Sequence, residues 1–384
     1  MLRSLTLAAT MAGVVAVLSV ACSGTLDPTP GFRPLSGDGN QGTVSQRPKQ
    51  QDGPTLTDQV SGTTQRFFAI SPVNSRIAWA SAAGGTYAVT TDGGDTWVSR
   101  QVPGAEALQF RDVEAVSSRI AYLLSIGDAT GDFRIYKTRD GGASWSIQFQ
   151  NTTENGFYDC FDFWNPNHGI TFADAVGGRF PVIETRDGRT WHDIGDRLPT
   201  PQTGEAGFAA SGTCVKTLDG QLGWIGTGGG AIARIFTTTD AGKHWEAHSA
   251  PSGLTQGTGT SGVVSIDFRD RLHGILGGGD VVASDVAQTN VARSSDGGNS
   301  WTLATSTPFP GAVYGLSYVP GGRQKTTVVA TGPGGAAWSP DEGSTWSDPL
   351  PGITNCWAVA FATRKAGWLV CGAGRIVKIS FDGN

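Results

Sequence analysis

A short motif recurs along this chain and constrains its fold more than any other feature. Residues 90–97 read TTDGGDTW, and the last copy, SFDGN from Ser380, is cut short by the end of the chain. Five more copies start at Thr138, Thr185 (one residue shorter), Thr238, Ser294 and Ser339. Their aspartates lie 41 to 56 residues apart, which is the length of one four-stranded propeller blade. The repeat therefore predicts seven similar structural units.

The segments between the motifs predict the strands of each unit. An alternating strand, a polar turn and a short apolar strand recur, as in FFAISPVNSRIAWAS from Phe67 and CFDFWNPNHGITF from Cys160. A third strand leads into each motif and a fourth follows its tryptophan. The last unit has no room for a fourth strand, and TLTDQV at 55–60 is the predicted substitute. We therefore expect an all-β, seven-bladed β-propeller of four-stranded antiparallel blades, closed by an N-terminal strand.

Composition supports this fold class and argues against one kind of partner. The chain has 56 glycines in 384 residues, 16% charged residues and a net charge of −5. These values favour short strands and tight turns over helices. Its densest cationic stretch is RPKQ at 47–50, so we expect no nucleic-acid partner.

The N-terminal segment is predicted to be a targeting signal followed by a tether. Residues 1–21 contain Arg3, an apolar run from Leu5 to Leu18 and a small-residue cleavage site before Cys22. LSVAC resembles a bacterial lipobox, which would make Cys22 a lipidated N-terminus; simple secretion is the alternative. Residues 22–54 are then a lipidated cysteine and a disordered tether rich in Pro, Gly, Ser and Gln. Residues 55–384 form the propeller, which is expected to work outside the cytoplasm.

The residue types of the motif suit a structural role. The aspartate accepts hydrogen bonds from its own turn, the glycine adopts a positive φ, and the tryptophan fills the gap between neighbouring sheets. We therefore expect twelve structural residues: Asp92, Trp97, Asp140, Trp145, Asp187, Trp191, Asp240, Trp245, Asp296, Trp301, Asp341 and Trp346.

The motif resembles the Asp-box, or BNR, repeat of sialidases, sortilin-like receptors and some polysaccharide-degrading enzymes. Over residues 62–384 the blade pattern is similar to the seven-bladed photosystem II assembly and stability factors and their bacterial relatives. This resemblance implies the fold and places the Asp-boxes opposite the face that binds ligands. It is unspecific for function, because the repeat occurs in enzymes and binding proteins alike.

The face opposite the Asp-boxes is where we expect a site. Its loops are the most variable, with long insertions at 199–213, 251–262 and 277–290. The charged and aromatic residues expected on this face have two interpretations. They are solvated or paired between blades, or they form a polar funnel whose arginines bind the carboxylates of a peptide or glycan. The candidate ligand-binding residues at this channel mouth are Arg66, Arg111, Asp112, Tyr158, Asp159, Asp174, Arg179, Arg234, Asp280 and Arg375.

The preferred interpretation is a non-enzymatic propeller that binds a protein or peptide, and an assembly or stability factor is one role of this kind. A carbohydrate-active enzyme and a glycan-binding module are the alternatives. A sialidase would need three convergent arginines and a Tyr–Glu pair. Arg66, Arg234, Arg375 and Tyr158 could supply part of that set, but the sialidase signature Phe/Tyr-Arg-Ile-Pro is absent and no Glu partner is apparent.

No cofactor or metal site is expected. His244 and His248 would share a strand face without a third ligand nearby. Four cysteines remain in the propeller. Cys356 and Cys371 lie on consecutive strands and could pair across that hairpin. Cys160 and Cys214 occupy equivalent positions in adjacent blades, where a disulfide is possible but buried free thiols are favoured.

Overall fold

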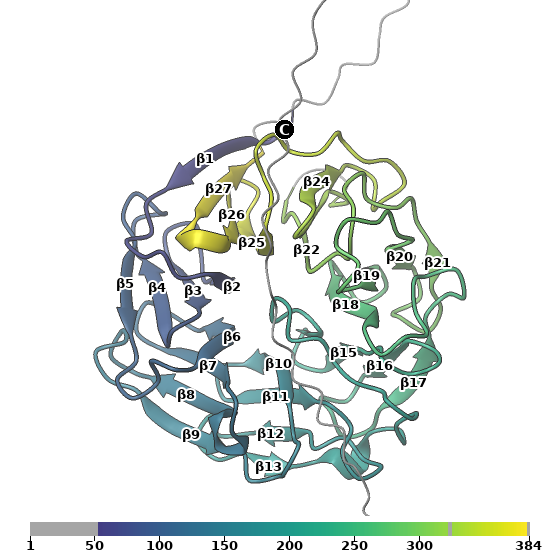
Figure 1. The fold of residues 1–384 in the computed structure, drawn as a ribbon, viewed down its shortest axis with the longest axis horizontal. Helices are drawn as coiled ribbons and strands as arrows, with labels where there is room; N and C mark the ends of the chain where they lie inside the picture. The colour runs from purple at the N-terminus through teal and green to yellow at the C-terminus, as the bar shows by residue number, and fades with distance from the viewer. Residues whose placement is uncertain (1–52, 322–324, 382–384) are drawn as a thin grey trace, which may run out of the picture. The chain divides into compact units, whose positions relative to one another are not determined.

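Seven antiparallel sheets surround a central channel, as the repeat predicts (Figure 1). The computed structural model describes residues 53–321 and 325–381. The signal segment, Cys22, most of the tether and Asp382 of the truncated motif lie outside the described residues. No helix in the described ranges is long and apolar enough to cross a membrane.

Each sheet is a meander whose first strand lies nearest the centre of Figure 1 and whose last lies at the rim. The first three blades contain β2 (Phe67–Pro72), β3 (Ala78–Ala82), β4 (Thr86–Thr90) and β5 (Val98–Gln101); β6 (Gln109–Ala115), β7 (Ala121–Ile126), β8 (Arg134–Thr138) and β9 (Ser146–Gln150); and β10 (Tyr158–Asn165), β11 (His168–Ala173), β12 (Ile183–Thr185) and β13 (His192–Asp193). The 3₁₀ turns η1 (Thr130–Asp132) and η2 (Gly195–Arg197) lie in loops of blades 2 and 3.

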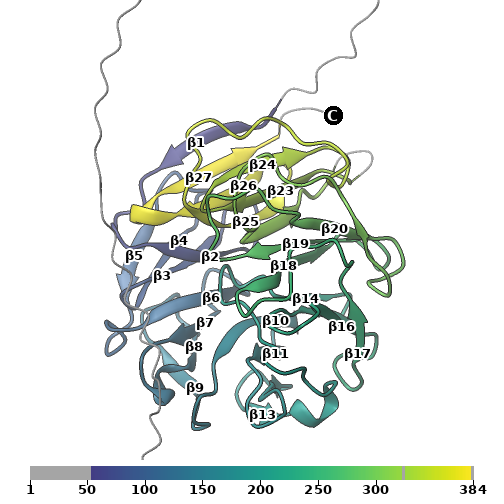
Figure 2. The same cartoon turned by 45° about the vertical axis from the view of Figure 1, so that its right-hand side comes forward.

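The remaining blades continue the ring (Figure 2). Blades 4 and 5 contain β14 (Val215–Leu218), β15 (Leu222–Gly226), β16 (Arg234–Thr238) and β17 (Glu246–Ser249), and β18 (Ser261–Phe268), β19 (Gly274–Asp280), β20 (Val291–Ser294) and β21 (Thr302–Leu303). Blades 6 and 7 contain β22 (Gly315–Tyr318), β23 (Val328–Gly332) and β24 (Gly335–Ser339), and β25 (Cys356–Thr363), β26 (Ala366–Cys371), η3 (Gly372–Gly374) and β27 (Ile376–Ser380). Blade 6 has three strands among the described residues instead of the expected four.

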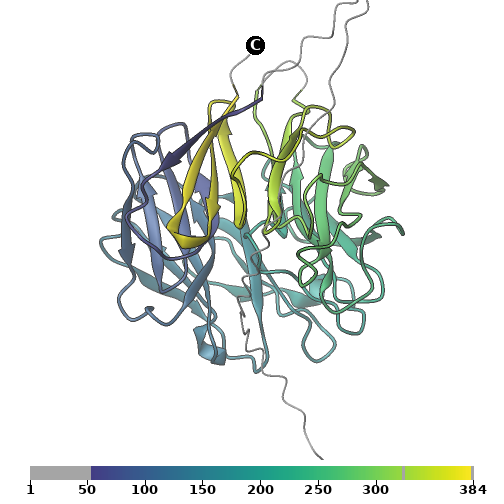
Figure 3. The same ribbon diagram turned by 45° about the horizontal axis from the view of Figure 1, so that its top comes forward.

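An N-terminal strand closes the ring, which confirms the prediction for TLTDQV. β1 (Thr55–Gln59) pairs antiparallel with β27 over five residues and becomes the outer strand of blade 7. Figure 3 shows this purple strand beside the yellow C-terminal strands. The Gln59 side-chain oxygen accepts hydrogen bonds from the indoles of Trp97 in blade 1 (2.9 Å) and Trp368 in blade 7 (3.0 Å). β1 therefore joins the first and last blades.

The core is divided among the gaps between blades. Seven buried clusters each combine residues of two adjacent blades. One of them combines blade 7 with blade 1 and so completes the ring. Every Asp-box tryptophan belongs to, or packs against, the cluster between its own blade and the preceding one. Trp97, Trp245 and Trp301 are each only 7% exposed. Blade-to-blade packing thus depends on the repeated motif.

Two disulfides cross-link the ring. Cys356 pairs with Cys371 directly across the β25–β26 hairpin, a pairing that the sequence left open. Cys160 pairs with Cys214 between blades 3 and 4, with Cα atoms 6.1 Å apart. The expectation of free thiols there was wrong, because adjacent inner strands bring the two residues within disulfide distance. Disulfides are typical of proteins that fold outside the cytoplasm.

Candidate functional site

The Asp-box turns identify the two faces of the ring. The Gly93 amide donates to the Arg76 carbonyl (2.8 Å), and the Gly141 amide donates to the Arg119 carbonyl (2.9 Å). The boxes therefore lie beside the turns that follow the inner strands. In an antiparallel meander, the starts of the inner strands and the loops between second and third strands lie on the other face. We call that face the mouth face.

Within each box the aspartate is occupied by its own turn. In the first copy, Asp92 accepts from the Thr96 hydroxyl (2.6 Å) and amide (3.0 Å) and from the Thr90 hydroxyl (2.8 Å). The Thr96 hydroxyl contributes most to lowering the pKa of Asp92 to about 2. The Ser144 hydroxyl has the same main effect on the pKa of Asp140. These carboxylates are ionised and locally satisfied, which suits a structural role.

Arginine side chains predicted at the mouth divide into two groups, and three of them are held by internal carboxylates. Arg179 forms a bidentate pair with Asp193, both distances being 2.8 Å. Arg375 donates to Asp58 of β1 (2.6 Å) and so supports ring closure. Arg234 pairs with Glu205. Their guanidinium groups are therefore already paired within the protein.

Glu205 is a residue of the mouth face that was not among the candidates predicted from the sequence. Its side chain is buried, with the residue 1% exposed, and it accepts from Arg234 Nε (2.8 Å), the Thr227 hydroxyl (2.7 Å) and the Gln202 amide (2.8 Å). It lies in the long 199–213 loop. The one feature of the sequence that could have indicated its role is that it is the single acidic residue of this loop. Arg234 and Arg375, two of the three arginines considered for a sialidase-like site, are thus committed elsewhere.

Asp112 serves as a link between blades. Its carboxylate accepts from the Val113 amide (2.7 Å) and from the Phe161 amide of blade 3 (2.9 Å). Asp162 and Asp267 make the same kind of link to Thr217 and Tyr318 of the following blades, at 2.6 and 2.8 Å. Because this pattern recurs, the hydrogen bonds to backbone amides are enough to explain an acidic side chain at the channel wall, and no bound ligand is needed to explain it.

Asp280, Tyr158 and the Asp159–Asp174 pair lie on the mouth face with internal contacts. Asp280 accepts from the Val282 amide (3.1 Å) in its own loop, and buried Tyr158 packs its ring on Phe149 (5.3 Å between centroids). Burial raises the pKa of Asp174 to about 6, and burial followed by the neighbouring Asp174 charge raises the pKa of Asp159. The two buried carboxyls therefore do not both ionise readily.

Arg66 and Arg111 form the second group of arginines, and they lie against aromatic rings at the mouth. The Arg111 guanidinium carbon lies 4.2 Å from the ring centroid of Phe68 and 5.3 Å from that of Trp357. Arg66 lies 5.2 Å from the same Trp357 ring. Trp357 also packs edge-on against Tyr314, at 5.0 Å between centroids. Blades 1, 2, 6 and 7 thus supply one cluster of two cations and three rings, which we call the mouth cluster.

Neither arginine of the mouth cluster has a carboxylate partner in an ion pair in the part of the chain that the structure describes. Arg111 donates to the Ala209 carbonyl (3.0 Å), and its buried Nε has no hydrogen-bond partner there. Burial, and next the charge of Arg66, lowers the pKa of Arg111 to about 10. The guanidinium groups of the mouth cluster can therefore bind an anionic group of a ligand.

The end of the 199–213 loop lies across the channel beneath the mouth. Ala209 accepts from Arg111 of blade 2, and the Ser211 hydroxyl donates to the Tyr314 carbonyl of blade 6 (2.6 Å). The Thr213 hydroxyl donates to Ser265 of blade 5 (2.7 Å). We call residues 207–213 the plug segment, because it joins opposite sides of the ring.

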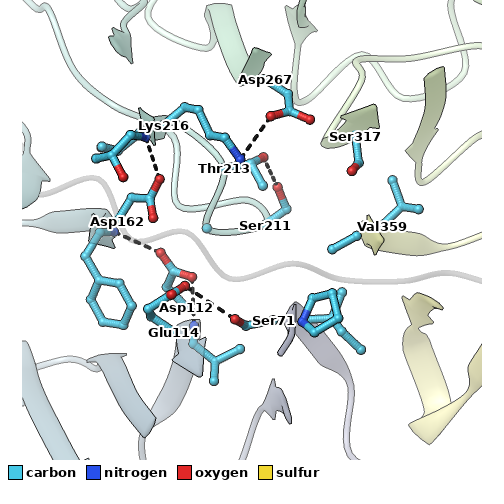
Figure 4. A pocket seen from close by; sticks show the side chains of 18 of the residues that line it. Ser71, Asp112, Glu114, Asp162, Ser211, Thr213, Lys216, Asp267, Ser317 and Val359 are labelled. Atoms are coloured by element: carbon cyan, nitrogen blue, oxygen red, sulfur yellow. Dashed lines mark hydrogen bonds and ion pairs between the residues drawn. The ribbon is translucent and has the colours of Figure 1, made fainter. Parts of the chain in front are cut away.

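Below the plug segment, the channel contains a cavity of about 290 Å³. All seven inner strands line it, and Ser211, Gly212 and Thr213 bound it on the mouth side. Figure 4 shows Glu114 and Asp162 on one side of this space and the Lys216–Asp267 pair on another. Sequence reasoning did not identify Glu114 or Lys216, because alternation along a strand does not distinguish channel-facing from blade-facing polar residues.

No known family model matches the chain, and no curated protein matches its sequence. Solved structures share its fold. A structure titled "YCF48 bound to D1 peptide" has a TM-score of 0.62 at 16% identity, covering 85% of this chain and 97% of that one. YCF48 from Cyanidioschyzon merolae has a TM-score of 0.59 at 15% identity, covering 85% and 98%. The WD40 propeller domain of Doa1 has a TM-score of 0.54 at 13% identity, covering 86% and 97%.

Proposed function

We propose that this protein is an extracytoplasmic propeller that binds a peptide or protein segment at its mouth cluster. The observation that carries this proposal is that Arg66 and Arg111 lie against the Phe68 and Trp357 rings, with Tyr314 packed on Trp357, and form no ion pair with a carboxylate among the described residues. Such a surface offers charge-assisted hydrogen bonds to a carboxylate and stacking surface for an adjacent side chain. Similarity to YCF48, whose structure with a D1 peptide is known, supports the same class of ligand.

The proposal assigns different roles to the candidate residues. Arg66 and Arg111 bind the ligand, whereas Arg179, Arg234 and Arg375 shape the loops around the site. Asp112, Tyr158, Asp159, Asp174 and Asp280 position the inner strands and the plug segment. A role as an assembly or stability factor would follow from holding an unfolded segment of another protein.

The two disulfides support an extracytoplasmic location. We further propose that Cys22 carries the lipid anchor and that the tether lets the propeller reach partners at a membrane surface. Two or more acyl chains hold a protein stably on a membrane, so Cys22→Ala is expected to release the protein from the membrane fraction.

A peptide array tests the binding proposal. The mature protein is applied to an array of random peptides, and affinities of the enriched peptides are measured for Arg66→Ala and for Arg76→Ala. Arg76 is an exposed arginine of the same blade on the Asp-box face, so it is a matched control.

We expect enrichment of peptides that combine a carboxylate with an aromatic or apolar neighbour. Arg66→Ala should weaken their binding roughly tenfold or more, because a hydrogen bond to a charged group contributes about 1.5–3 kcal/mol. Arg76→Ala should leave it unchanged. Enrichment without any carboxylate preference, or equal losses in both variants, would contradict the proposal.

A further inference from the structure

The channel cavity is separate from the mouth cluster and has its own chemistry. It lies on the Asp-box side of the plug segment and is formed by the later residues of inner strands such as β2 and β6. Its volume of about 290 Å³ could hold roughly ten water molecules at about 30 Å³ each. A small organic molecule therefore fits, and a folded chain segment does not.

The charged residues that line the cavity are Asp112, Glu114, Asp162, Lys216 and Asp267. They come from β6, β10, β14 and β18. The lining residues of β2, β22 and β25 are apolar or carry hydroxyls, as Ser71 and Ser317 do. One cation therefore shares the cavity with four acidic side chains.

Three of the acidic groups have full internal partners. Asp112 and Asp162 each accept two backbone amides. Asp267 accepts two amides and also pairs with Lys216 Nζ at 3.0 Å. These interactions satisfy the aspartates and use the only lining cation.

Glu114 is the exception. In the part of the chain that the structure describes, its one hydrogen bond comes from the Ser71 hydroxyl, at 3.3 Å to Oε2, and its side chain lines the cavity. Burial, together with the neighbouring charge of Asp162, raises the pKa of Glu114 to about 8. An empty cavity thus favours a protonated Glu114, and a cation bound there would restore its charge.

We propose that the cavity binds a small organic cation through a primary ammonium group, with Glu114 as its counter-charge. An ammonium group has three donors, and Glu114 and the adjacent Ser71 hydroxyl oxygen can accept from it. Val113, Leu316 and Val359 supply apolar wall for an alkyl stem. A metal ion fits less well, because no group of three or more His, Cys, Asp or Glu among the described residues could hold one.

Calorimetric titration of the mature protein with cadaverine tests this proposal. Pentanediol is the neutral control ligand, and Nα-acetyl-lysine amide distinguishes a protein side chain from a free amine as the source of the ammonium. Glu114→Gln keeps the side-chain size and removes the charge. Glu154→Gln makes the same charge change at an exposed loop position, so it is the matched control.

Cadaverine should bind and pentanediol should not. Glu114→Gln should weaken cadaverine binding at least tenfold while Glu154→Gln leaves it unchanged. As the pH increases toward 8, the affinity of the wild-type protein for cadaverine should increase by up to about tenfold per pH unit, because binding releases the Glu114 proton. Glu114→Gln should abolish this pH dependence even if its melting temperature shifts.

Each alternative outcome has a definite meaning. Binding of the blocked lysine alone would support the ammonium chemistry and assign it to a protein side chain. No binding of either amine at pH 8, equal binding of pentanediol, or unchanged binding in Glu114→Gln would overturn the proposal. The mouth cluster plays no part in this test, so a negative result leaves peptide binding unaffected.

Discussion

At the scale of single residues, the Asp-box tryptophans pack in the gaps between blades. Trp245 is 7% exposed and belongs to the cluster between blades 3 and 4, where it meets Cys214, Phe236 and their neighbours. Its indole nitrogen is buried and has no hydrogen-bond partner in the described part of the chain. The ring therefore contributes through packing.

This gives a prediction for two variants of one residue. Trp245→Ala should lower the free energy of unfolding by about 3–5 kcal/mol, because it leaves a cavity between blades. Trp245→Phe should cost less than half as much, since it keeps an aromatic ring and loses no hydrogen bond. Denaturant unfolding of both variants measures the difference. Equal losses in the two variants would contradict a role through ring packing and would indicate that the indole nitrogen has a hydrogen-bond partner.

Residue roles on the mouth face could be predicted only in part. The sequence placed Arg66, Arg111 and Arg234 together at the mouth, and their strand positions are indeed on that face. It could not show that Arg234 meets Glu205, because the partner lies in a long loop whose path depends on contacts with four blades. For the same reason Glu114 and the plug segment were not foreseen.

At the scale of elements, β1 is the piece that turns an open array into a ring. It supplies a ladder of five paired residues to blade 7 and the Gln59 oxygen that two indoles share. Without it, β27 would be an exposed edge strand. Strand periodicity was enough to predict this element, because the last blade visibly lacked a strand and only one unused segment remained.

Removal of β1 should therefore destabilise the whole ring. Deleting residues 55–59 should cost roughly 5 kcal/mol, because each lost hydrogen bond contributes about 1 kcal/mol, and should lower the melting temperature sharply. Deleting residues 25–50, in the predicted tether, should change it little. Gln59→Ala alone should cost about 1–3 kcal/mol, since it leaves two indole donors without their acceptor. Thermal melts that show equal effects for the two deletions would contradict the role of β1.

At the scale of the whole molecule, the fold was predictable and the site was predictable only as a face. Seven copies of a motif at blade-length intervals of 41 to 56 residues indicate the number of blades, and the hydrogen bonds within each copy are local in sequence. The cation–aromatic contacts of the mouth cluster join four blades that are far apart in sequence. Such contacts form only when the ring closes, so they cannot be predicted from the sequence pattern of any single segment.

The distribution of carboxylates predicts an unusual dependence of stability on pH. The Asp-box aspartates have lowered pKa values, about 2 for Asp92, Asp140 and Asp240. Their contribution is complete above the unfolded value of 3.8 and is lost as the pH falls toward 2. Burial raises the pKa values of Asp174 and Glu114 to about 6 and about 8, and it also raises those of Asp112, Asp159 and Asp162. The folded protein holds their protons more tightly, so their contribution is lost as the pH rises from about 4 toward 8.

The two groups together predict a melting temperature that peaks between about pH 4 and pH 5, whereas most proteins are most stable between about pH 5 and 8. Calorimetric melts across this range measure the curve. Glu114→Gln should flatten the decline between about pH 5 and 8, because a neutral amide replaces the group that would otherwise ionise inside the channel. Glu154→Gln, on an exposed loop, should leave the decline in place. A melting temperature that rises steadily to pH 8 would mean that ligands, waters or structural relaxation already compensate the charge of Glu114, and both the pH curve and the ammonium site would then need a different account.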